Sequence, residues 1–179
     1  MVVFKTYIIF NELPTIKHLS HKNHVLYQDV KCPSCGVIDE DQQHLWLCQS
    51  RSHTINNIKQ KFITTLVEQS AIINEQQQID ADKIEIIINS YGFINIIQKL
   101  IPISIGNYIA SILNSQQRYN IIEKAITTLY ELLYDNIWIP CCNKMNELEQ
   151  RLGITKEMKM KYNVLRSNTN YRHNISHST

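Results

Sequence analysis

Four potential metal ligands lie within one short stretch of the chain, where Cys32, Cys35, His44 and Cys48 follow the spacing C-x2-C-x8-H-x3-C. Two cysteines that close a tight turn can direct both thiolates at one ion, and Gly36 supplies the backbone freedom that such a turn needs. His44 and Cys48 are four positions apart, so on a helix both side chains lie on the same side. The pattern therefore predicts a zinc ion bound by these four residues.

The predicted zinc ion is structural rather than catalytic. Four protein ligands leave no open position for water or substrate, and zinc catalysis requires one. The sequence also lacks the HExxH helix of metalloproteases and the HxE…PCxxC pattern of zinc deaminases. The alternative is that the four residues are unrelated side chains, in the core or on the surface. Two ligand pairs within one short stretch favour the metal site.

The order of motifs around these ligands resembles that of a known family. Between about residues 11 and 52, the matching elements are Leu13-Pro14-Thr15 with Leu19, the pair Cys32 and Cys35, the acidic run Asp39-Glu40-Asp41, and His44-Leu45-Trp46-Leu47-Cys48. This arrangement is similar to the zinc-binding domain at the C-terminal end of non-LTR (LINE-type) retrotransposon reverse transcriptases. The resemblance implies a detached C-terminal piece of a retroelement polyprotein, whose module would help to hold template RNA or target DNA.

Beyond the ligands, apolar residues recur at helical spacing over most of the chain. We expect one long helix from about Arg51 to Gln69 and a second helical run from about Ser115 to Leu152, which Pro140 kinks or breaks and Gly153 ends. The apolar stripe of the first is Ile55, Ile58, Phe62, Ile63 and Leu66, and that of the second is Ile122, Ile126, Leu129, Leu133, Ile137, Cys141, Met145, Leu148 and Leu152. The predicted fold is mainly α, a helical bundle stapled by a small CCHC zinc module near the N-terminus.

The stretch from Ile84 to Leu113 is almost entirely apolar, which raises the question of a membrane span. Polar residues and Pro102 divide it into runs shorter than the roughly 20 residues that a bilayer requires. We therefore expect buried helices, separated at Tyr91-Gly92 and at Pro102, and no membrane association.

The cysteines indicate a reducing compartment. The chain has five, and the two that are not proposed ligands, Cys141 and Cys142, are adjacent and poorly placed to bridge each other. This is not the pattern of a secreted disulfide framework, so we expect an intracellular protein of the nucleus or cytoplasm. Without a basic neighbour, these two cysteines are expected to pack in the core.

Positive charge is concentrated at the C-terminal end. Residues 151–179 carry six lysines and arginines against one acid, whereas residues 1–150 carry twelve against fifteen acids. We expect a zinc-binding module over 1–52, a helical domain over 53–152 and a basic, disordered tail over 153–179. The candidate contacts to nucleic-acid phosphate are Lys156, Lys159, Lys161, Arg166 and Arg172. The alternative is an ordinary solvated tail.

No catalytic motif accompanies these features, so we do not expect an enzyme. Reverse transcription needs clustered aspartates to hold two metal ions, and the nearest approach, Tyr134-Asp135-Asn136, offers a single carboxylate within an expected helix. The leading hypothesis is a non-catalytic zinc-binding accessory module that contacts RNA or DNA, and other retroelement domains. There are two alternatives. One is a zinc-stabilised protein-interaction or scaffold domain, and the other is a relic reading frame without a selected role.

Overall fold

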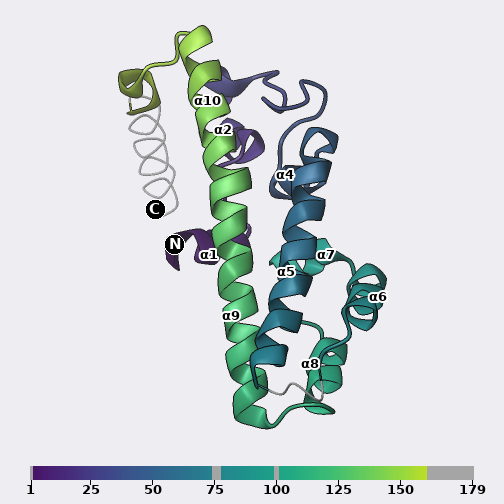
Figure 1. Cartoon of the computed structure of the whole chain (residues 1–179). Helices are drawn as coiled ribbons and strands as arrows, with labels where there is room; N and C mark the ends of the chain where they lie inside the picture. The colour runs from purple at the N-terminus through teal and green to yellow at the C-terminus, as the bar shows by residue number, and fades with distance from the viewer. Residues whose placement is uncertain (1, 74–77, 99–100, 161–179) are drawn as a thin grey trace, which may run out of the picture. The chain divides into compact units, whose positions relative to one another are not determined.

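A computed structural model describes residues 2–73, 78–98 and 101–160 of the chain (Figure 1). Over these residues the structure is mainly helical and contains no strand, which confirms the predicted α class. None of the described helices is both long enough and apolar enough to cross a membrane. The contacts divide the chain into two compact units, and each combines two stretches that are distant in sequence.

The first unit joins residues 1–12 to residues 49–140. Its helical elements are α1 (Val2–Ile9), the 3-10 turn η1 (Gln49–Arg51), α5 (Ser52–Ile73), α6 (Ala81–Tyr91), α7 (Phe93–Gln98), α8 (Ile103–Ala110), α9 (Ser115–Leu133) and the π-helical turn η2 (Tyr134–Trp138). Helices α5 and α9 lie side by side and form the main contact of this unit (Figure 1). Phe4 of α1 packs its ring edge-on against Tyr134, at 5.2 Å between centroids.

The buried face of α5 is the predicted stripe, since all five of its apolar residues are buried. On α9, however, the buried residues in the first half are Ile121 and Ala125, and the predicted Ile122 and Ile126 are only half-buried. Ile121 and Ile122 are equally apolar, so hydrophobicity does not distinguish the two faces. The small side chain of Ala125 allows a close approach of another helix, which the larger Ile126 does not.

The apolar stretch from Ile84 to Leu113 forms short helices, as predicted. Asp80 caps α6 by accepting hydrogen bonds from two backbone N–H groups of its first turn. Helix α6 ends at Gly92, which has φ +88°, and Pro102 precedes α8. The ring of Phe93 on α7 lies 6.3 Å from that of Phe62, so this segment packs against the buried face of α5.

Pro140 does not break the helix that follows α9. The chain stays helical through η2 into α10 (Ile139–Arg151). Proline lacks an N–H group and its ring collides with the carbonyl four residues earlier. The π-helical turn contains one residue more than an α-helical turn, because the N–H of Ile139 bonds to the carbonyl of Tyr134, five positions back. This wider turn accommodates the proline without ending the helix. The predicted break is therefore absent.

The second unit joins residues 13–48 to the chain from Cys141 onward. It contains α2 (Ile16–Lys22), α3 (His24–Tyr27), α4 (Gln42–Leu47), α10 from Cys141 and a helical segment at residues 156–160. Ile16, Tyr27 and Met145 form its buried cluster. Half-buried residues that pack against this cluster are Leu19, Leu26, Val30, Leu148 and Ile154.

Gly153 ends α10, as predicted. It has φ +67°, and its N–H bonds to the carbonyl of Gln150 while that of Ile154 bonds to the carbonyl of Glu149. This pair of bonds is a Schellman motif, in which the left-handed residue favours glycine. The turn brings Ile154 against the buried cluster of Ile16, Tyr27 and Met145. The compact units thus do not coincide with the ranges 1–52 and 53–152, and the predicted domain division stays a prediction.

Candidate metal centre

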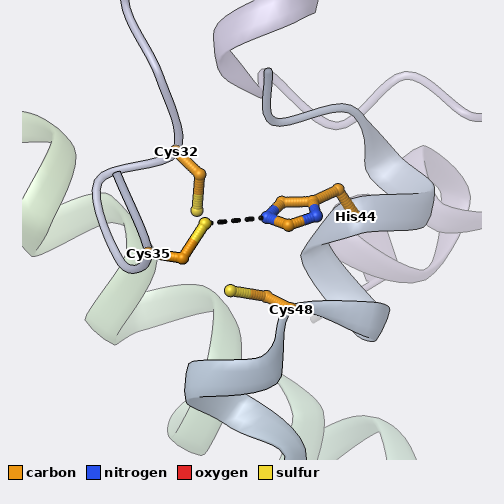
Figure 2. A group of neighbouring side chains, drawn as sticks. All are labelled: Cys32, Cys35, His44 and Cys48. Carbon is orange, nitrogen blue, oxygen red and sulfur yellow. Dashed lines mark hydrogen bonds between the residues drawn. The ribbon is translucent and has the colours of Figure 1, made fainter. Parts of the chain in front are cut away.

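The first two candidate ligands lie on a short turn. The N–H of Gly36 donates to the carbonyl of Cys32 at 2.8 Å, and Gly36 has φ +70°, a region that favours glycine. The N–H of Cys32 donates to the carbonyl of Ile38 at 2.8 Å, which closes the base of the loop. These bonds direct the side chains of Cys32 and Cys35 to the same side of the loop (Figure 2).

The other two candidate ligands come from α4 and its C-terminal end. Asp41 caps this helix, since its carboxylate accepts a hydrogen bond from the N–H of His44 at 2.8 Å. The carboxylate of Asp41 thus lies at the N-terminal end of α4, where negative charge is favourable. The N–H of Cys48 donates to the carbonyl of His44 at 2.8 Å, so the two residues are one helical turn apart. Both side chains therefore lie on one side, as the sequence spacing predicts.

The four side chains converge on one point (Figure 2). Their potential ligand atoms all lie within 4.8 Å of one another, and Cys35 Sγ is 3.4 Å from His44 Nε2. Zn–S bonds of ~2.3 Å and Zn–N bonds of ~2.0 Å give tetrahedron edges of roughly 3.5–3.8 Å. The arrangement therefore fits a four-coordinate ion after a small contraction. Cys32 and Cys48 are buried, and Cys35 and His44 are half-buried.

The two cysteines of the turn have opposite electrostatic environments. Burial raises the pKa of the Cys32 thiol to about 12, although the N–H groups of Ser34 and Cys35 oppose this shift. The N–H of Val37, with smaller help from the His44 ring, lowers the pKa of Cys35 to about 6. Backbone donors thus favour thiolate at both sulfurs. Burial opposes it at both, and Glu40 also opposes it at Cys32. A bound dication supplies the positive charge that stabilises a buried thiolate.

Glu40 takes part in this site in a way that the sequence did not predict. It is fully buried, and its two carboxyl oxygens accept hydrogen bonds from Cys32 Sγ at 3.2 Å and Cys141 Sγ at 3.3 Å. The sequence interpretation placed Glu40 only in an acidic run ahead of a helix, and Cys141 in the core. Cys141 is indeed buried. No sequence pattern links two residues that are 101 positions apart, so this contact could not have been found from spacing.

The structure describes two of the five candidate nucleic-acid contacts. Lys156 is exposed, whereas the ammonium group of Lys159 lies 2.6 Å from a carboxylate oxygen of Glu149. Lys159 therefore participates in an ion pair of the second unit. Lys161, Arg166 and Arg172 lie outside the described residues, as does most of the predicted tail.

Comparisons with protein-family models, with curated proteins and with solved structures give no match.

Proposed function

We propose that the chain is a non-catalytic zinc-binding module, in which one structural zinc ion is bound by Cys32, Cys35, His44 and Cys48. The supporting observation is the convergence of four ligand atoms to within 4.8 Å of one another. Three thiolates and one imidazole are a donor set that zinc favours over hard cations such as magnesium or calcium. The ion would staple the turn at residues 32–36 to α4.

We further infer that the module is an accessory domain of a retroelement reverse transcriptase and contacts RNA or DNA. The support comes from the motif order between residues 11 and 52 and from the excess of positive charge after residue 150. Such charges bind phosphates without sequence preference, and binding of this type weakens steeply with salt because counterions are released. Lys159 is assigned to the Glu149 ion pair, so Lys156, Lys161, Arg166 and Arg172 are the remaining candidates.

The nucleic-acid proposal is tested with the zinc-loaded full chain and labelled single-stranded RNA and DNA across a salt series. The variant carries Lys156→Gln, Arg166→Gln and Arg172→Gln. A control of equal charge carries Lys22→Gln, Lys61→Gln and Lys124→Gln, at exposed positions elsewhere. We expect the first variant to weaken binding at least tenfold and to flatten the salt dependence, with little change in the control.

Equal losses in both variants would mean that binding is diffuse rather than located in the basic segment. Absence of binding at low salt would reject the nucleic-acid role and favour the alternative, a zinc-stabilised interaction or scaffold domain. The zinc assignment is independent of either outcome, because it is measured by metal content.

A further inference from the structure

One face of α10 contacts the loop that carries Cys32 and Cys35. Cys141 Sγ donates to Glu40, and Lys144 Nζ donates to Ser34 Oγ at 3.4 Å, within the turn between Cys32 and Cys35. Further along the same face, Met145 belongs to the buried cluster of the second unit. Steps of three and four residues keep these side chains on one side of a helix.

Among these contacts, the one at Cys141 reaches a metal ligand most directly. Glu40 bridges Cys141 Sγ and Cys32 Sγ through its two carboxyl oxygens, at 3.3 and 3.2 Å. The carboxyl group is fully buried, and a buried polar group requires hydrogen-bond donors to offset its loss of water. The backbone carbonyl of Glu40 also accepts the N–H of Lys17, so the residue is held at both ends. A displacement of α10 would therefore alter the surroundings of Cys32.

We propose that Cys141 is a positioning residue of the metal centre: its hydrogen bond to Glu40 joins α10 to the loop that carries Cys32 and Cys35, and so couples metal binding to the docking of α10. The bond from Cys32 to Glu40 exists only while Cys32 is a thiol, because zinc displaces that proton. This inference rests on the proposed zinc site. Residues around the ligands of metal sites typically change metal affinity by about 10- to 100-fold when they are replaced. Coupling between two binding equilibria is reciprocal. If docking of α10 raises the affinity for the metal by some factor, the metal raises the equilibrium constant for docking of α10 by the same factor.

Cys142 provides a matched control. It is a neighbouring thiol of the same helix, half-buried, and it lies about 100° around the helix from Cys141. Replacing either cysteine by alanine removes the same group from α10. Only the replacement at 141 removes the hydrogen bond to Glu40. The variant Cys141→Ser retains a donor at that position and serves as a rescue.

The experiment measures the zinc dissociation constant of the full chain by competition with a chromophoric chelator, for the native protein, Cys141→Ala, Cys141→Ser and Cys142→Ala. Amide hydrogen exchange of residues 144–151 is followed with and without zinc. We expect Cys141→Ala to weaken zinc binding about tenfold and to lose the zinc-dependent slowing of exchange. We expect Cys141→Ser to recover most of the affinity and Cys142→Ala to stay within about twofold of the native protein.

Equal dissociation constants for the two alanine variants would overturn the inference, as would native exchange rates that do not respond to zinc. If Cys141→Ala does not fold, a Cys141→Ser variant that binds zinc at least tenfold more weakly than Cys142→Ala contradicts the role of the hydrogen bond. A native protein that binds no zinc would reject the proposed function itself, which distinguishes the two failures.

Discussion

Glu149 is a buried carboxylate of the second unit that forms an ion pair. Its carboxylate accepts a hydrogen bond from the Tyr27 hydroxyl and pairs with the ammonium group of Lys159. Tyr27 and Glu149 are both buried, and they are 122 positions apart in the sequence. The contact therefore ties residues 13–48 to α10, and it gives Lys159 a structural role that its position in a basic segment did not suggest.

Replacing Tyr27 by phenylalanine removes the hydroxyl donor and leaves a buried carboxylate less well satisfied. We expect Tyr27→Phe to lower the free energy of unfolding by about 1–3 kcal/mol. The control Tyr119→Phe, at an exposed residue of α9, is expected to change it by less than about 0.5 kcal/mol. Urea unfolding of the zinc-loaded proteins measures both, and equal effects would show that the hydrogen bond does not stabilise the fold.

The same hydrogen bond predicts a dependence on alkaline pH. Burial, and then Glu149, raises the pKa of Tyr27 above its ordinary value of 10.0. The unfolded chain releases this proton first as the pH rises, so the folded state loses stability above about pH 10. We expect the native protein to lose more stability than Tyr27→Phe between pH 9.5 and 11, measured by thermal unfolding. If the stability of the two proteins changes in parallel with pH, the raised pKa is not that of Tyr27.

Loss of a proposed cysteine ligand should remove the metal, whereas loss of Cys142 should not. Cys48→Ser removes a buried ligand, whereas Cys142→Ser alters a half-buried thiol outside the cluster. We expect the first variant to lose most of its zinc and the second to retain about one ion per chain. Elemental analysis after dialysis gives the number of zinc ions per chain. Equal zinc loss in the two variants would show that the ligand set is wrong.

At the level of helices, local signals in the sequence were sufficient to predict several boundaries. The interruptions at Gly92 and Pro102 and the stop at Gly153 follow from single residues with strong backbone preferences. The register of α9 was wrong where two apolar faces compete. A kink or a break was predicted at Pro140, and the helix continues there without a break. The π-helical turn that precedes Pro140 was not predicted, because it has no simple sequence signature.

The end of α10 provides a test of backbone strain with an internal control. An added Cβ meets no atom within 4 Å at either Gly153 or Gly106, but only Gly153 has a positive φ. We expect Gly153→Ala to lower the free energy of unfolding by about 1 kcal/mol, because alanine is strained in this region. Gly106→Ala, within α8, should raise it by up to about 1 kcal/mol. Urea unfolding measures both changes. If the two substitutions change the free energy of unfolding with the same sign, this explanation is wrong.

At the level of the whole molecule, the sequence did not indicate which segments combine. Periodicity identifies the buried face of a helix but not the element that covers it. Within the described residues, 13–48 pack with 141–160, and 2–12 pack with the segments between 49 and 140. The four metal ligands were predictable because they lie within seventeen consecutive residues, 32–48, whereas Glu40 and Cys141 meet only through the tertiary fold.

Metal removal should act unequally on the two units. Structural zinc contributes on the order of 10 kcal/mol to the folding of small sites. We expect a strong chelator to unfold residues 13–48, while α5 and α9, whose contacts lie in the other unit, remain helical. Hydrogen exchange with mass spectrometry resolves the two regions. Unchanged exchange throughout residues 13–48 would contradict a structural role for the ion.

The most direct test is X-ray absorption at the zinc edge on the zinc-loaded full chain, together with its metal content. Binding by Cys32, Cys35, Cys48 and His44 predicts one zinc per chain, with three sulfur neighbours at about 2.3 Å and one nitrogen at about 2.0–2.1 Å. A substoichiometric metal content, or a shell of oxygen and nitrogen without sulfur, would contradict the metal centre described above.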